Sequence, residues 1–162
     1  MKTANTPATK AADQKSAAVA KALGSLLGDS YALLGQLHVA HWNVEGPNFH
    51  SLHTAFQTQY EELFVAIDDI AERIRALGFF SPGGLKTLAA LSSITELPIE
   101  EIPSKDYVAH LVECHEIVVE TALKAREISE KEGDLETQAL VIGRVQTHEK
   151  FLWMLRSHLK NL

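Results

Sequence analysis

Two histidines and two carboxylates in the first half of the sequence could together bind a ferrous ion. His41 and His53 lie at the two ends of the stretch HWNVEGPNFHSLH, whose central Gly-Pro pair indicates a chain reversal. Asp68 and Glu72 are one helical turn apart, so on a helix their carboxylates project from one face. Two imidazoles and two carboxylates form a mixed nitrogen and oxygen set that suits Fe(II) and leaves positions open for an oxidant.

Each half of this set also has a simpler explanation. An isolated carboxylate pair is usually a solvated acidic face, and here Arg73 and Arg75 are close enough in sequence to neutralise it. A single histidine on an apolar face is usually a hydrogen-bonded core residue. The combination of all four residues is therefore what favours a metal site.

The spacing decides how such a site can be built. His53 and Asp68 are 15 residues apart on one uninterrupted helical pattern. At about 1.5 Å per residue the separation is roughly 22 Å, whereas the ligands of one ion must come within about 2.0–2.3 Å of it. One chain cannot close this gap. We therefore expect the histidines of one subunit to meet the carboxylates of another across a two-fold contact.

A di-iron centre in the core of one bundle is not expected. That arrangement needs Glu-x-x-His on two helices, and no glutamate of this sequence has a histidine three positions later. The interface site is thus the better candidate.

The elements that would position these residues are all predicted to be helices. Apolar residues at spacings of three and four begin at Ala18 and describe a first helix that ends near His41. A second helix is predicted over 49–77, a short one within 85–94, a third with Ser104 as its N-cap, and a fourth from about Asp134. Four long helices with one long crossover predict an all-α four-helix bundle.

Composition indicates one domain. A chain of 162 residues with 46% hydrophobic residues can bury a single core. We expect a flexible tail over 1–9 and the bundle over 10–162. Cys114 is the only cysteine, which excludes a disulfide framework and a thiolate zinc cluster. With no apolar leader or membrane-length run, we expect a cytoplasmic protein.

Charge is unevenly distributed along the chain. The net charge is −6, but residues 1–21 carry four lysines and one aspartate, hence +3, and the remainder carries −9. An acidic body repels nucleic acid, whereas a basic tail can bind its phosphates without sequence preference. Lys2, Lys10 and Lys15 are the candidate DNA-binding residues.

Three motifs resemble those of the Dps proteins, the mini-ferritins named as DNA-binding proteins from starved cells. They are HVAHWNVEGPNFHSLH (38–53), DDIAERIRALG (68–78) and HEKFLWMLRSHL (148–159). The resemblance covers nearly everything after the tail. It implies a ferritin-like four-helix bundle, assembled as a hollow dodecamer that oxidises Fe(II), preferentially with hydrogen peroxide, and stores the ferric product inside.

The resemblance also assigns roles to residues. It implies ferroxidase sites at two-fold interfaces, with His41 and His53 from one subunit and Asp68 and Glu72 from its partner. Glu72 would be the bridging or tightest ligand. Trp42 would lie beside the metal, where it could equally be a packing aromatic or intercept radicals. Many relatives carry an aspartate where this chain has Gln57, so the second iron should be held loosely or through water.

Alternatives remain open at this stage. The protein could act mainly as a nucleoid protein that compacts DNA through its tail, or as a helical scaffold without metal. His38 with His41, and His50 with His53, could each bind a zinc or copper ion, although His38 and His50 are expected to be spectators. Zinc could also compete with iron for the site. The remaining histidines show no partner pattern, and the acidic cluster Glu127, Glu130, Glu132 and Asp134 could line a pore in a shell.

Overall fold

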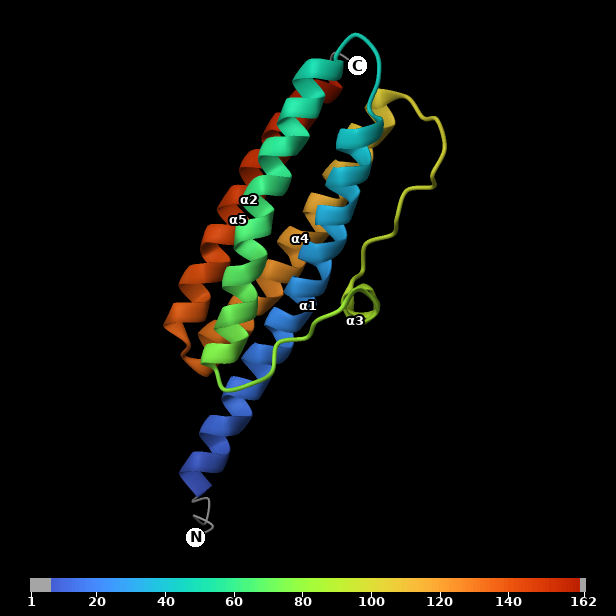
Figure 1. Ribbon diagram of the computed structural model, residues 1–162. Coiled ribbons are helices and arrows are strands. Elements are labelled where there is room, and N and C mark those ends of the chain that lie inside the picture. Colours follow the sequence, from blue (N-terminus) through green and yellow to red (C-terminus); the bar gives the residue numbers. More distant parts are fainter. Residues whose placement is uncertain (1–6, 161–162) are drawn as a thin grey trace.

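The protein is a bundle of four long helices. The computed structural model describes the backbone of residues 7–160 and the side chains of residues 16–160. This part of the chain forms α1 (Pro7–Asn43), α2 (Phe49–Ala76), α3 (Leu85–Leu91), α4 (Ser104–Glu132) and α5 (Leu135–Leu159), and it contains no strand. The long helices lie side by side, and the short α3 packs against α1 from outside (Figure 1). The predicted all-α bundle with a short helix in its crossover is confirmed.

Local signals account for several helix ends. Gly78, just after the end of α2, has a φ of +92°, a conformation that glycine adopts without a steric penalty. Gly133 closes α4 in the left-handed conformation. Asp134 is the N-cap of α5, and its carboxylate accepts a hydrogen bond from the Thr137 amide, as expected for the start of this helix.

Two helix starts differ from the sequence-based prediction. Ser104 is the first helical residue of α4 and not its N-cap, which is Pro103. Pro103, with a φ of −56°, has no side-chain acceptor, and its main-chain oxygen accepts a hydrogen bond from the Asp106 amide at 2.9 Å. Helix α1 begins at Pro7, so residues 7–9 of the expected tail are helical. Residues 1–6, with Lys2, lie outside the described residues.

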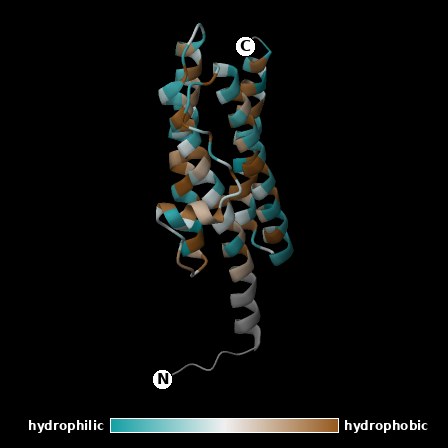
Figure 2. Ribbon diagram, turned by 90° about the vertical axis from the view of Figure 1, so that its right-hand side faces the viewer, coloured by the Kyte–Doolittle hydropathy of each residue, from teal (hydrophilic) through white to brown (hydrophobic). Residues whose placement is uncertain are grey.

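The core is formed by apolar residues of the four long helices. Hydrophobic and hydrophilic stretches alternate along each of these helices (Figure 2). Fully buried side chains include Leu23, Leu26, Leu33, Leu37, Leu52, Phe56, Leu63, Ile70, Ile74, Leu111 and Leu155. Phe64 was expected on the inward stripe of α2, but it is 68% exposed, because it lies a further 100° round the helix from the buried Leu63. Between residues 7 and 160 no helix is long and apolar enough to cross a membrane.

A buried carboxylate fastens the crossover to the bundle. Asp29 of α1 is 1% exposed and accepts hydrogen bonds from the Ser92 hydroxyl, the Ser93 amide and the Thr121 hydroxyl. Ser92 and Ser93 follow α3, and Thr121 belongs to α4. The long crossover is therefore held in place along α1.

Candidate metal-binding site

The turn between α1 and α2 brings His41 and His53 together. His41 is near the end of α1 and His53 is in the second turn of α2. Gly46 takes a φ of +97° in the connection, where the chain reverses. As a result the two imidazole rings stack with centroids 3.7 Å apart and an interplanar angle of 18°. The two predicted nitrogen ligands are therefore adjacent in the folded chain.

Hydrogen bonding fixes the tautomer of both rings. The Nδ1 atom of His41 lies 2.9 Å from the main-chain oxygen of His53, and the Nδ1 atom of His53 lies 2.8 Å from the main-chain oxygen of His41. A carbonyl oxygen only accepts, so both Nδ1 atoms must donate. The neutral rings then carry their lone pairs on Nε2, the atoms left to bind a metal.

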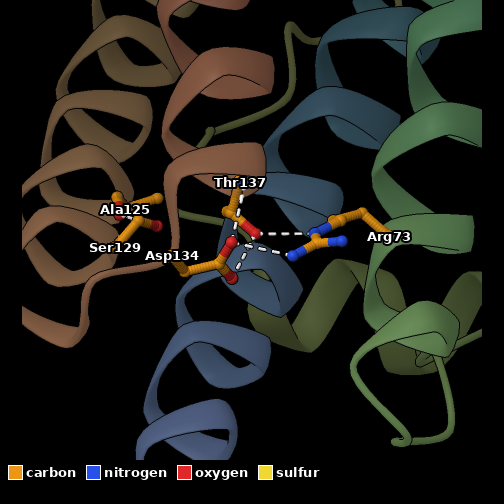
Figure 3. Close-up of polar contacts among 5 residues, drawn as sticks. All are labelled: Arg73, Ala125, Ser129, Asp134 and Thr137. Atoms are coloured by element: carbon orange, nitrogen blue, oxygen red, sulfur yellow. Dashed lines mark hydrogen bonds and ion pairs between the residues drawn. The ribbon is translucent and has the colours of Figure 1, made fainter.

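Asp68 and Glu72 are exposed on the outer face of α2. Their neighbouring arginines do not neutralise them. Arg73 turns toward α5, where its Nη2 donates to the Asp134 carboxylate at 2.7 Å and its Nε donates to the Thr137 hydroxyl at 2.8 Å (Figure 3). The expected neutralisation by Arg73 is therefore not found, and both carboxylates stay on an exposed face of α2.

Arg75 is also engaged elsewhere. Its guanidinium donates to the main-chain oxygen of Phe79 and lies 4.5 Å from the centre of the Phe80 ring.

Asp134, which was considered as a pore residue, is likewise held by internal contacts. Burial raises the pKa of Asp134, but hydrogen bonds from Thr137 and the charge of Arg73 outweigh burial and keep that pKa below its usual value.

The histidine pair and the carboxylate pair do not meet within one subunit. His53 lies near the start of α2 with His41 of α1 stacked on it, whereas Asp68 and Glu72 lie in the later part of α2. Within the described residues, no group of three or more histidine, cysteine, aspartate or glutamate side chains is placed to hold a metal ion. Within one subunit the predicted nitrogen ligands and the predicted oxygen ligands are thus separate.

Comparisons with known proteins identify the family of this chain. The model of the ferritin-like domain matches residues 20–162. DNA protection during starvation protein 2 of Bacillus anthracis is 34% identical over 141 residues, which cover 87% of this chain and 96% of the relative. The DNA protection during starvation protein of Helicobacter pylori is 31% identical over 137 residues, covering 85% and 95%.

Solved structures point to the same family. The crystal structure of a Dps protein from Vibrio cholerae O1 superposes with a TM-score of 0.86 at 28% identity, covering 91% of this chain and 92% of that one. That protein is described as a member of a broad superfamily of ferritin-like diiron-carboxylate proteins. This chain belongs to the Dps proteins. The predicted family and fold are therefore confirmed.

Two aromatic residues, Trp42 and Tyr60, lie next to the histidines at the α1–α2 turn of this Dps chain. Trp42 is 68% exposed and stacks on His38, with centroids 5.2 Å apart and an interplanar angle of 7°. Tyr60 lies between His38 and His41, at centroid distances of 4.6 and 5.2 Å. His38 was expected to be a spectator, and Tyr60 was not predicted as part of the site. The spacing of His38 and Trp42, one turn apart, was the available signal.

The other residues of the predicted set are less closely connected. Gln57 donates from its amide to the Glu61 carboxylate at 2.7 Å, along the outer face of α2. His50 is exposed, and His53 contacts the Phe49 ring at 5.0 Å. Lys10 and Lys15 belong to the helical backbone of α1, but their side chains lie outside the described residues.

Sequence reasoning missed a second histidine pair in the bundle core. His115 of α4 and His148 of α5 are each 1% exposed, and their Nδ1 atoms are 2.8 Å apart. Gln59 and Glu62 of α2 and Arg144 of α5 complete the group. The available signal was that both histidines fall on apolar stripes, between Leu111 and Val118 and beside Val145 and Leu152, but nothing in the sequence pairs them.

Proposed function

We propose that this protein is a ferroxidase and iron-storage Dps whose metal sites are assembled from two subunits. The observation that carries the proposal is the reciprocal hydrogen bonding of His41 and His53. It leaves the Nε2 lone pairs of the two stacked imidazoles unused near the start of α2, while Asp68 and Glu72 lie 15 and 19 residues beyond His53 along the helix. Each half-site lacks the ligands that the other supplies.

The outer face of α2 supports a two-fold contact between subunits. At 100° per residue, His53, Gln57, Phe64 and Asp68 fall within an arc of roughly 60° on this helix. Phe64 and Val65 are 68% and 61% exposed near its middle, an apolar patch that a second copy would cover. Antiparallel packing of two α2 helices about a point near residue 62 sets His53 of one copy opposite Asp68 and Glu72 of the other.

The four ligands would bind and orient Fe(II), which is here the substrate. Neutral imidazoles and carboxylates hold it with positions left for the oxidant. Hydrogen peroxide takes one electron from each of two ferrous ions, its O–O bond breaks, and with two water molecules the products are two units of FeOOH and four protons. The exposed Trp42 follows His41 in the chain, and the Tyr60 ring contacts the His41 ring, so both aromatic residues lie beside the histidine pair.

A direct test combines mass and kinetics. The purified protein should sediment as a dodecamer of about 214 kDa, twelve times 17.8 kDa, and should speed oxidation of Fe(II) by peroxide. The His41→Ala/Glu72→Gln variant should lose this acceleration. Asp69→Asn, which changes an exposed carboxylate next to Asp68, is the matched control and should keep it. An active monomer, or a variant as fast as the unmodified protein, would refute the proposal.

DNA binding is a second candidate function, favoured by the separation of charge along the chain. Residues 1–21 carry +3 and the rest carries −9, and two relatives are named for DNA protection. Twelve weak basic segments on one particle would act together. A low-salt gel shift with intact protein and with protein lacking residues 1–15 tests this: only the intact protein should retard DNA, and salt should abolish the effect.

A further inference from the structure

The core of the bundle contains a continuous chain of hydrogen bonds that the proposed iron site does not use. It runs from Gln59 of α2 through His115 of α4 to His148 and Arg144 of α5, and returns to Glu62 of α2. The linking distances are 3.0 Å, 2.8 Å, 3.2 Å and 2.9 Å in that order. We call these five residues the buried histidine chain.

The direction of every bond in the chain follows from Arg144. A guanidinium only donates, so Nε2 of His148 must accept from it and the proton of His148 lies on Nδ1. That proton is donated to Nδ1 of His115, whose own proton must then lie on Nε2 and be donated to Oε1 of Gln59. The two histidines are therefore opposite tautomers, and both are neutral.

No position in the chain can take a further proton without breaking it. The free lone pairs of the two rings already accept hydrogen bonds, so a proton added to His148 would face the Arg144 guanidinium, and one added to His115 would face the N–H of His148. The buried histidine chain already has more hydrogen-bond donors than acceptors, because the buried Nε of Arg144 has no hydrogen-bond partner among the described residues. A second buried cation beside Arg144 would be costly.

The charged side chains around the buried histidine chain do not compensate for the cost of protonating its histidines. From α2, Glu62 faces the chain, but its carboxylate is already paired with both terminal nitrogens of Arg144. From α5, the Arg144 guanidinium donates to His148, and from α4 comes His115 itself. The buried Asp29 of α1 binds the crossover and Thr121 instead. Burial, and then the charge of Arg144, lowers the pKa of His115 to about 3. Burial, and then the neighbouring His115 and Arg144, lowers the pKa of His148 well below its usual value.

The chain also links the helix that carries the proposed metal site to the opposite side of the bundle. Gln59 and Glu62 connect the middle of α2 to α4 and α5, and Arg73 connects its later part to α5. The outer face of the same stretch of α2 presents Gln57, Glu61 and Phe64. Loosening these internal bonds would remove the polar restraints that hold α2 to α4 and α5.

We propose that the buried histidine chain is an acid-sensitive latch, which holds α2 against α4 and α5 and opens when its histidines take up protons. The opened form charges its histidines near their ordinary pKa of about 6.5, whereas the closed form resists charging until far lower pH. The latch is therefore fully closed above about pH 6.5 and weakens progressively as the pH falls below that value. This concerns the subunit itself and stands whether or not α2 forms an iron site.

Hydrogen exchange of the assembled protein tests the latch. After correction for intrinsic exchange rates, protection of amides 59–66 should fall between pH 7 and 5.5 by about tenfold for each histidine that charges on opening, hence roughly hundredfold. His115→Gln and His148→Gln should each reduce this pH effect to about tenfold. The control is His50→Gln, which changes an exposed histidine of α2, the helix that is monitored. This variant should behave like the unmodified protein. Protection of α2 that does not change with pH, or that falls equally in all helices, would overturn the proposal.

A measurement on the unmodified protein keeps the proposal testable should the core variants fail to fold. Solid-state NMR of protein with 15N-labelled histidine should show, at neutral pH, one strongly coupled pair with its protons on Nε2 of one ring and Nδ1 of the other. This pair should stay neutral at pH 5.5. Two core rings in the same tautomer, or protonated at pH 5.5, would contradict it.

Discussion

The imidazole of His41 donates to the main-chain oxygen of His53, and that of His53 donates to the main-chain oxygen of His41. Because each ring is oriented by the other residue's backbone, the end of α1 and the start of α2 hold both imidazoles in fixed orientations, with Nδ1 used in the hydrogen bonds and Nε2 left over. A metal would therefore meet ligands that are already ordered, and little conformational entropy would be lost on binding.

Replacing one member of this pair should weaken iron binding strongly. His53→Ala removes one ligand and also the donor that restrains the main chain of His41. Since loss of an orienting partner alone lowers metal affinity about 10–100-fold, we expect at least that loss in anaerobic Fe(II) titrations. His50→Ala, three residues earlier on the same helix, is the control. Equal affinities of the two variants would exclude His53 as a ligand.

Gln57→Asp should strengthen binding of the second iron. The amide of Gln57 now donates to Glu61, and a carboxylate is a better iron ligand than an amide. We expect the number of Fe(II) bound tightly per site to rise toward two, at a cost of a few tenths of a kcal/mol from repulsion by Glu61 one turn away. Gln57→Asn keeps the amide and should leave the stoichiometry unchanged. An unaltered stoichiometry in Gln57→Asp would place residue 57 outside the site.

Gly28 of α1 should be essential for the packing of α3. A Cβ atom at this position would lie 2.7 Å from the Leu91 Cβ and 3.0 Å from the Leu88 main-chain oxygen. Gly28→Ala should therefore displace α3 and destabilise the protein by about 1–3 kcal/mol in urea unfolding at fixed protein concentration.

Gly35 of the same helix provides the matched comparison. A Cβ there meets no atom within 4 Å, so Gly35→Ala should stabilise the protein by about 0.5–1 kcal/mol through helix propensity alone. If both variants were stabilised, the close approach of α3 to α1 would be refuted.

The sequence predicted the bundle because its determinants are local. The Gly-Pro turn, Gly78 and the Asp134 cap each act within a few residues, and the apolar stripes have a period that packing rarely overrides. The start of α1 was missed because residues 7–9 are small or polar and show no apolar period, and proline at the first position of a helix is compatible with its start. Phe64 was misplaced because its position depends on which neighbour covers α2.

The candidate site was predictable only in part. His41, His53, Asp68 and Glu72 follow from ligand chemistry and from helical rise, both of which can be read from spacing. Tyr60 and His38 depend on how the rings of α1 and α2 meet. His115 and His148 depend on the pairing of α4 with α5 across 33 residues of sequence, and a histidine on an apolar stripe carries no sign of its partner.

The sharing of each site between subunits is tested most directly by mixing two inactive variants. One carries His41→Ala and His53→Ala, and the other carries Asp68→Ala and Glu72→Ala. Random pairing of equal amounts makes half of the dimers hybrid, each with one complete site of two, so co-assembled protein should recover about a quarter of the unmodified rate of Fe(II) oxidation by peroxide. Recovery no greater than the sum of the two parents would mean that each chain supplies all its own ligands, and would contradict the account.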